Sequence, residues 1–113
     1  MKKEKISILI TNFNKEKFLD ECIQSCLNQN YENLEIIIID NLSTDNSLNI
    51  IKKYSSKLLI KIRRRSSIYA PQNQIDSLIE AFNCSKGEII LLLDSDDYIS
   101  RNKVSRIINI FDN

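Results

Sequence analysis

The hydrophobic pattern of this 113-residue chain changes its period repeatedly, and this constrains the fold more than any other feature of the sequence. Runs of branched apolar residues that are typical of strands lie at 6–10, 34–39, 58–62 and 89–93. Stretches whose apolar residues recur every three or four positions, as on one face of a helix, lie at 18–27, 48–54, 75–82 and 104–111. This alternation predicts an α/β domain, β-α-β-α-β-α-β-α, whose mostly parallel sheet has helices on both faces.

Polar and sulfur-containing residues refine the prediction for the first two helices. Asn14 is expected to cap the first helix, and the Ser-Thr-Asp segment at 43–45 is expected to cap the second. Cys22 and Cys26 lie four positions apart on the apolar face of the first helix. With only three cysteines in the chain, we expect buried free thiols rather than a disulfide framework or a metal site.

Two unusual residue counts exclude several function classes. The chain has no histidine, which excludes Ser-His-Asp and Cys-His nucleophile systems and zinc sites that contain histidine. It has one glycine, Gly87, which excludes the Walker A loop and the G-x-G-x-x-G dinucleotide loop. The net charge of +1 gives no reason to expect a nucleic-acid partner. Any phosphate chemistry must therefore use other means, such as carboxylates that hold a metal ion.

The sequence contains no candidate transmembrane segment. Its longest apolar runs, 36–39 and 89–93, are far too short to span a membrane, and the N-terminus lacks the apolar stretch of a signal peptide. We therefore predict a cytoplasmic location, with any membrane association coming through other parts of the protein or through partners.

Polar clusters follow each of the predicted strands. In open α/β sheets, ligands bind at the carboxyl ends of the strands, so these clusters are expected to lie along one edge. They comprise 11–14 (TNFN), 40–45 (DNLSTD), 63–66 (RRRS) and 94–97 (DSDD). An aromatic residue, an isolated acid, a basic run and an acid cluster on one edge suit a nucleotide together with a divalent metal.

The acid cluster is the strongest of these signals. Asp94 and Asp96 are two positions apart at the end of a strand, so their carboxylates can point to one side. Two adjacent carboxylates are costly unless a cation neutralises them, and Mg²⁺ or Mn²⁺ binds carboxylate and phosphate oxygens together. The alternative is that these acids only cap the last helix.

Simpler alternatives also exist for the other clusters. Asp40 could accept a hydrogen bond from a base or ribose, or it could form a turn with its neighbours. Phe13 could stack on a base, or it could pack against the first helix. The arginines at 63–65 could attract a diphosphate, or they could form a solvated loop.

Four segments, taken in order, resemble the family 2 glycosyltransferases, which are inverting enzymes with the GT-A (Rossmann-like) fold. Segment 6–14 (ISILITNFN) resembles the opening strand and loop of the family, and 18–29 (FLDECIQSCLNQ) resembles its first helix. Segment 35–45 (EIIIIDNLSTD) resembles the family's Val-Asp-Asp-Gly-Ser-Thr-Asp segment, and 87–97 (GEIILLLDSDD) resembles the strand that carries its D-x-D motif. The order and spacing of the four segments make the resemblance specific.

The resemblance implies a UDP-sugar donor, a divalent metal (Mn²⁺ or Mg²⁺) and a carbohydrate or lipid-linked acceptor whose hydroxyl attacks the anomeric carbon with inversion. It implies nucleotide-binding roles for Thr11, Phe13, Asn14, Asp40, Asp94 and Ser95. It also implies that Asp96, with Asp94, binds the metal and helps the departing UDP. Asp97 and Gln74 match family positions without an assigned role.

The sequence departs from the family pattern in several places, among them Leu78-Ile79, where a small polar pair is common. Thr11 lies where proline is usual, Asn41 where a second aspartate is frequent, and Leu42 where glycine is usual. The general base and the acceptor site of the family are expected beyond Asn113. Residues 1–113 are thus predicted to be the nucleotide-sugar-binding part of a larger domain.

Two readings from other classes remain as alternatives. One is a receiver-like signalling domain, although such domains place their acids after the first and third strands. The other is a truncated binding module without activity. A sugar nucleotidyltransferase is less well matched, because such enzymes need a glycine-rich loop after the first strand.

Overall fold

The computed structural model describes residues 4–63 and 70–112. Its elements are β1 (Ile6–Asn12), α1 (Glu16–Leu27), β2 (Leu34–Asp40), α2 (Ser47–Lys52), β3 (Leu59–Ile62), α3 (Ala70–Cys84), β4 (Ile89–Asp94) and α4 (Lys103–Asp112). The strands form one sheet of order β3-β2-β1-β4, and every neighbouring pair is parallel. The predicted alternation and parallel sheet are therefore confirmed.

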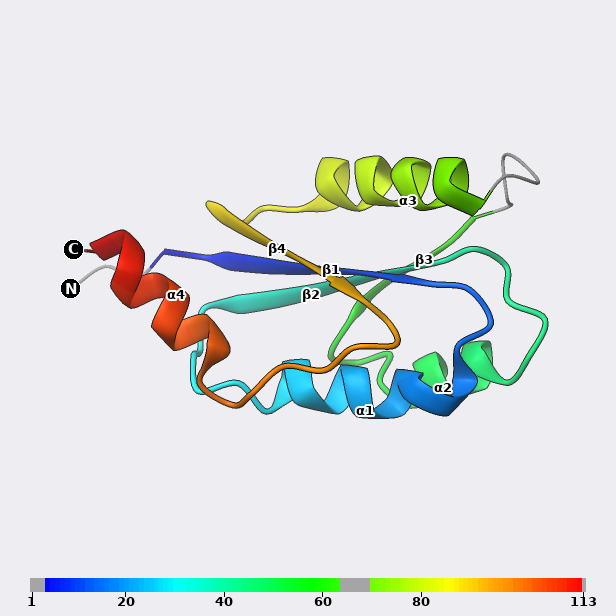
Figure 1. Ribbon diagram of the computed structural model, residues 1–113, viewed down its shortest axis with the longest axis horizontal. Coiled ribbons are helices and arrows are strands. Elements are labelled where there is room, and N and C mark those ends of the chain that lie inside the picture. Colours follow the sequence, from blue (N-terminus) through cyan, green and yellow to red (C-terminus); the bar gives the residue numbers. More distant parts are fainter. Residues whose placement is uncertain (1–3, 64–69, 113) are drawn as a thin grey trace.

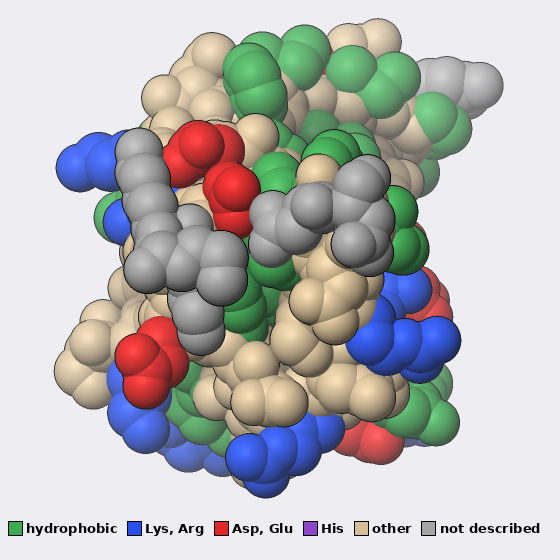
Figure 2. All heavy atoms as spheres, turned by 90° about the vertical axis from the view of Figure 1, so that its left-hand side faces the viewer, with side chains coloured by type: hydrophobic (Ala, Val, Ile, Leu, Met, Phe, Trp, Pro, Cys, Tyr) green, Lys and Arg blue, Asp and Glu red, His purple; other side chains and the backbone are tan. Residues whose placement is uncertain are grey.

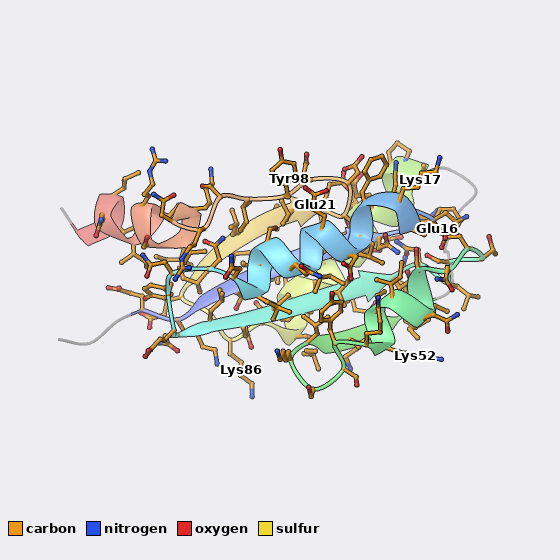
Figure 3. All side chains as sticks on the ribbon, turned by 90° about the horizontal axis from the view of Figure 1, so that it is seen from below. Glu16, Lys17, Glu21, Lys52, Lys86 and Tyr98 are labelled. Carbon is orange, nitrogen blue, oxygen red and sulfur yellow. The ribbon has the colours of Figure 1, made fainter. Side chains whose placement is uncertain are left out.

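The sheet lies between two helical layers. Figure 1 shows α1 and α2 on one face and α3 on the other, and Figure 3 shows α1 crossing the lower face with α2 beside it. Because strand side chains alternate between faces, Ile8 and Ile10 of β1 join the core that includes α1 residues, whereas Leu9 joins the core that includes Ala81 of α3. The central strands β1 and β2 are thus buried on both faces.

Cysteine burial also follows the prediction. Cys22 and Cys26 of α1 are fully buried free thiols, and Cys84 is a half-buried one. The Cys22 thiol donates to the carbonyl oxygen of Asp94 at 3.8 Å, which links α1 to the end of β4. The adjacent Cys26 and burial both raise the pKa of the Cys22 thiol. Among the described residues, no helix is long and apolar enough to cross a membrane.

The start of α1 differs from the prediction, because Asn14 is not its cap. Asn14 has a left-handed backbone (φ 53°), and its Oδ1 accepts hydrogen bonds from the backbone N–H groups of Thr44 and Asp45. Lys15 occupies the cap position and makes no side-chain cap bond. Instead, Asp45 accepts from the Glu16 N–H at 3.0 Å and from the Ser47 N–H at 2.9 Å, so one carboxylate serves the starts of α1 and α2.

Replacing Asp45 with alanine is expected to lower the free energy of unfolding by about 2 kcal/mol at pH 7, because each lost cap costs about 1 kcal/mol. Partial burial opposes ionisation of this carboxyl, but the hydrogen bonds from Ser47 and Glu16 hold its pKa below the usual range. The stabilisation is therefore complete above the unfolded pKa of about 4 and is lost as the pH falls through the folded value.

Urea denaturation of the wild type and of Asp45→Ala at pH 7 and at about pH 3 measures this difference. Asn46→Ala is the matched control, because Asn46 occupies the cap position of α2 but makes no side-chain cap bond. A loss no greater than that of the control, or one independent of pH, would contradict the shared-cap role of Asp45.

The sheet covers the apolar stripe of α3 only in part. The stripe predicts the helix correctly, but the residues that α3 buries are Asn73, Ser77 and Ala81. Ile79 and Phe82 are more than half exposed, and Figure 2 shows hydrophobic side chains gathered across the top of the molecule, where α3 lies. Together with residues of the free edge strand β4, they line an apolar groove of about 360 Å³. We call this surface the α3/β4 apolar face; its lining residues are Leu9, Leu78, Ile79, Phe82, Ile90 and Leu92.

Candidate functional site

A polar pocket of about 270 Å³ lies where the carboxyl ends of β1, β2 and β4 meet the N-terminal end of α3. Three of the predicted site residues, Thr11, Phe13 and Asp94, line it. Parallel pairing brings them together, since Thr11 lies opposite Asp94 in the register of β1 and β4. The described lining residues are Thr11, Asn12, Phe13, Lys15, Asn41, Ala70, Asn73, Gln74 and Asp94.

Asp40 is not among these lining residues. It is fully buried, and its Oδ1 accepts hydrogen bonds from Asn12 Nδ2 and from Ser43 Oγ, both at 2.7 Å. Its Oδ2 accepts from the Ser43 backbone N–H at 2.8 Å. The carboxylate thus ties the end of β2 to the end of β1. In this structure Asp40 organises the loops that surround the pocket.

Asn41 takes the place in the lining that the sequence predicts for Asp40. Its Oδ1 accepts hydrogen bonds from Arg63 Nη1 at 3.0 Å and from Ser77 Oγ at 2.9 Å, which fixes the orientation of the amide. From the sequence, Asn41 is one member of the polar cluster 40–45 and a departure from the family pattern, with no binding role assigned to it. The alternation of side chains along β2 offers a signal for Asn41, because neighbouring residues of a strand point to opposite sides and Asn41 directly follows Asp40.

Arg63 is held by α3 rather than presented to the pocket. Its guanidinium forms ion pairs with Glu80 at 3.4 Å and with Asp76 at 4.0 Å, and only 17% of its side chain is exposed. Arg63, the first residue of the basic run, is therefore not part of a solvated loop. Arg64 and Arg65 lie outside the described residues.

Asn12 was also missed, although it lies between two predicted residues. Its Nδ2 donates to Asp40 and more weakly to Ser43, whereas its buried Oδ1 has no hydrogen-bond partner among the described residues. A buried acceptor without a partner is uncommon and costs about 1–3 kcal/mol.

The acid cluster is divided between the pocket and its rim. Asp94 lines the pocket, and both partial burial and the nearby Asp96 raise the pKa of its carboxyl group. Asp96 lies outside the lining, and its Oδ2 is 3.6 Å from the Lys15 ammonium. Ser95 is fully buried, and its backbone N–H donates to the carbonyl of Thr11. Ser95 therefore joins β4 to β1 rather than facing the pocket.

The loop after β2 also explains one departure in the sequence. Leu42 has φ 56°, a left-handed conformation that glycine adopts without cost and that a leucine side chain disfavours. Its side chain is half exposed, so packing does not compensate for this strain. The preference for glycine that the resemblance implies at this position thus reflects the backbone.

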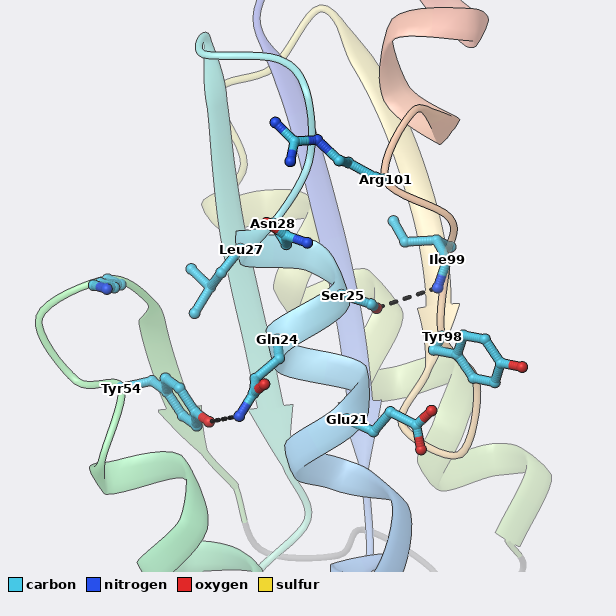
Figure 4. A pocket seen from close by; sticks show the side chains of 10 residues that line it. Glu21, Gln24, Ser25, Leu27, Asn28, Tyr54, Tyr98, Ile99 and Arg101 are labelled. Carbon is cyan, nitrogen blue, oxygen red and sulfur yellow. Dashed lines mark hydrogen bonds between the residues drawn. The ribbon is translucent and has the colours of Figure 1, made fainter.

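A larger groove of about 540 Å³ lies on the outer surface of α1 (Figure 4). Gln24 donates to the Tyr54 hydroxyl across it, and the Ile99 backbone N–H donates to Ser25 Oγ at its other side. None of the predicted site residues lines it. Chemistry rather than size therefore identifies the pocket at the strand ends as the candidate site.

Comparisons with known proteins agree with the predicted fold and family. The profile of the family described as "Glycosyl transferase family 2" matches residues 7–113. The chain is 38% identical over 106 residues to an uncharacterized glycosyltransferase of Haemophilus influenzae, a match that covers 92% of this chain and 41% of that protein. It is 39% identical over 112 residues to a poly(ribitol-phosphate) beta-glucosyltransferase of Bacillus spizizenii, covering 93% and 17%.

Among solved structures, Staphylococcus aureus TarS 1–349 in complex with UDP-GlcNAc matches with a TM-score of 0.76 and 29% sequence identity. The match covers 96% of this chain and 31% of that one. The chain therefore spans about two fifths or less of each of these three proteins. All three are glycosyltransferases by name or by bound donor, and they give no support to the receiver-like or non-catalytic alternatives.

Proposed function

The chain belongs to glycosyl transferase family 2, and we propose that its polar pocket binds the nucleotide of a UDP-sugar donor. The observation that carries the proposal is the convergence of Thr11, Phe13, Asn41 and Asp94, from three strand ends, on one pocket. Its 270 Å³ is slightly below the roughly 300–1,000 Å³ of complete small-molecule sites, as suits a pocket that holds one part of a donor.

Each polar wall of this pocket suits a part of the nucleotide. Phe13 offers an aromatic face to the base. The amide of Asn41, with its Oδ1 already engaged by Arg63 and Ser77, has its Nδ2 to donate to a base carbonyl. Asp94, which lines the same pocket, would accept from ribose hydroxyls or share a cation with the diphosphate.

We further propose that Asp94 and Asp96 hold a divalent cation, Mn²⁺ or Mg²⁺. The described residues contain no group of three or more acids, cysteines or histidines arranged around a metal. Two carboxylates nevertheless fit an ion that takes its remaining ligands from phosphate oxygens and water. The raised pKa of Asp94 supports the proposal, because partial burial and the nearby Asp96 disfavour its negative charge and a cation would offset both effects. When bound, the ion would neutralise charge on the departing diphosphate.

In the whole protein, we propose that an acceptor hydroxyl, on a carbohydrate or a lipid-linked molecule, receives the sugar with inversion. Residues 1–113 would form the nucleotide-sugar-binding part, and a carboxylate elsewhere in the protein would act as general base. The exposed α3/β4 apolar face supports this division. An apolar surface of this kind on a soluble domain is usually covered, and further residues of the same domain would cover it.

Calorimetric titration of UDP with and without Mn²⁺ tests the proposal. Mn²⁺ is expected to tighten UDP binding about tenfold or more, because Asp94 and Asp96 would hold the ion and its charge would offset that of the diphosphate. Asp96→Ala is expected to abolish this enhancement. Glu88→Ala removes an exposed acid at the opposite end of β4 and is expected to leave it intact.

Two results would overturn parts of the proposal separately. No UDP binding at millimolar concentration by the folded chain would overturn the nucleotide site. UDP binding that Mn²⁺ does not alter, or that Asp96→Ala leaves equally dependent on Mn²⁺, would overturn the metal role of Asp96 and leave the nucleotide site in place.

A further inference from the structure

We propose that Lys15 is the counter-ion of Asp96 in the metal-free protein, that it competes with the divalent cation for this carboxylate, and that it then contacts the donor diphosphate. Sequence reasoning gave Lys15 no role. The inference rests on the proposed function, because it concerns the same carboxylates and the same pocket. It adds a positioning residue that couples metal binding to donor binding.

The placement of Lys15 is fixed by the start of α1. Its backbone carbonyl accepts hydrogen bonds from the N–H groups of Phe18 and Leu19, both at 3.0 Å, so its Cα is anchored at the helix end. From there the side chain reaches the loop after β4, where the ammonium lies 3.6 Å from Asp96 Oδ2. The backbone is thus rigid, and the flexible four-carbon stem can move between partners.

Lys15 also lines the polar pocket, where it is the one cationic side chain among the described lining residues. Asp94 lies in the same lining, and the Lys15 charge counteracts the effects that raise the pKa of Asp94. Lys15 therefore neutralises part of the charge of both carboxylates that the proposed cation would use. A lysine ammonium and a divalent cation cannot both hold Asp96 Oδ2 at contact distance without strong repulsion.

The ion pair is weak enough to be exchanged. The side chains of Lys15 and Asp96 are 45% and 39% exposed, and an exposed pair changes an equilibrium by a factor of about five at most. A divalent cation carries twice the charge and accepts several oxygen ligands, so it displaces the ammonium at a small penalty. Once released, the ammonium remains beside the pocket, where the diphosphate is the nearest new anion in the proposed complex.

The proposal predicts effects of opposite sign for one substitution. Lys15→Met removes the competing charge and is expected to tighten binding of Mn²⁺ alone about two- to fivefold. The same substitution is expected to weaken UDP binding in saturating Mn²⁺ by about fivefold or more, because a contact with the diphosphate is lost. A residue that only supported the fold would weaken both equilibria.

Electron paramagnetic resonance of free Mn²⁺ measures the first equilibrium without nucleotide, and calorimetry in saturating Mn²⁺ measures the second. Lys17→Met is the matched control, since it makes the same charge change on an exposed side chain of α1 (Figure 3). It is expected to alter either equilibrium less than twofold. Lys15→Arg keeps the positive charge. Its affinity for Mn²⁺ alone and its affinity for UDP in saturating Mn²⁺ are therefore both expected to be close to those of the wild type.

The outcomes separate this inference from the proposed function. If wild-type protein binds Mn²⁺ but Lys15→Met tightens it no more than Lys17→Met does, the inference is overturned and the metal site stands. The same holds if UDP binding in Mn²⁺ is unaffected by Lys15→Met. If wild-type protein binds no Mn²⁺ in the absence of nucleotide, this inference is overturned, whereas the proposed metal site still stands or falls with the effect of Mn²⁺ on UDP binding.

Discussion

Asp40→Ala is expected to lower the free energy of unfolding by about 3 kcal/mol, because it removes a fully buried acceptor of three hydrogen bonds. Asn12 Nδ2 would lose its strongest partner, and the backbone N–H of Ser43 would lose the carboxylate it donates to. An unsatisfied buried donor costs about 1–3 kcal/mol, and two such donors account for the expected loss.

Urea denaturation at neutral pH measures this loss, and Asp97→Ala is the control. Asp97 is an exposed acid in the loop after β4, so removing its side chain is expected to change stability by less than about 0.5 kcal/mol. If Asp40→Ala cost under about 1 kcal/mol while UDP binding disappeared, Asp40 would contact the nucleotide directly, as the sequence predicts, and its structural role would be secondary.

Gly87→Ala is the second substitution for which we expect a large effect, a destabilisation of about 3 kcal/mol or more. An added Cβ would lie 2.4 Å from Ser7 Oγ and 2.6 Å from the Ser7 backbone nitrogen. The Ser7 hydroxyl is fully buried, donates to Glu35 and accepts from the Gly87 N–H, and the backbone of Ser7 belongs to β1, a central strand buried on both faces. The clash would therefore have to be relieved by moving the chain before β4.

A double substitution separates the two contacts. The destabilisation caused by Gly87→Ala is expected to be smaller in a Ser7→Ala background than in the wild type, because the hydroxyl contact is absent there, and the loss that remains reflects the contact with the Ser7 backbone. Lys86→Ala, at the exposed neighbour, is expected to cost less than about 0.5 kcal/mol. A Gly87→Ala protein as stable as Lys86→Ala would show that β4 can shift freely relative to β1.

The sequence predicted the edge of the sheet at which the polar pocket lies, but not which side chains line that pocket. The positions of Thr11, Phe13 and Asp94 followed from strand ends alone, because parallel strands bring their carboxyl ends to one edge. Asp40 and Asn14 were expected to bind the nucleotide, yet their side chains bind partners 28–31 positions away in the chain or near neighbours in the same loop. Nothing in the local pattern distinguishes an acid that faces a pocket from one that fastens two loops together.

Lys15 is the opposite case, a residue without a predicted role that lies at the pocket. Its position before α1 is typical of an exposed lysine, and only the approach of the loop after β4 brings Asp96 within 3.6 Å. Asn41 likewise reaches the pocket because Arg63 and Ser77, from two other elements, hold its amide in place. These contacts depend on the turn conformations of several loops together, so single-segment patterns cannot predict them.

By itself, the sequence determined the four strand–helix alternations, the parallel sheet they require and the edge at which ligands would meet it. Hydrophobic periodicity carries that information because burial acts on each segment separately. The tertiary structure alone decided which side chains face the pocket, and that α3 leaves its apolar stripe partly exposed while Asn73 and Ser77 pack inward. Those outcomes depend on hydrogen bonds and packing between segments that are distant in sequence. Such contacts form only when several loops adopt compatible conformations together.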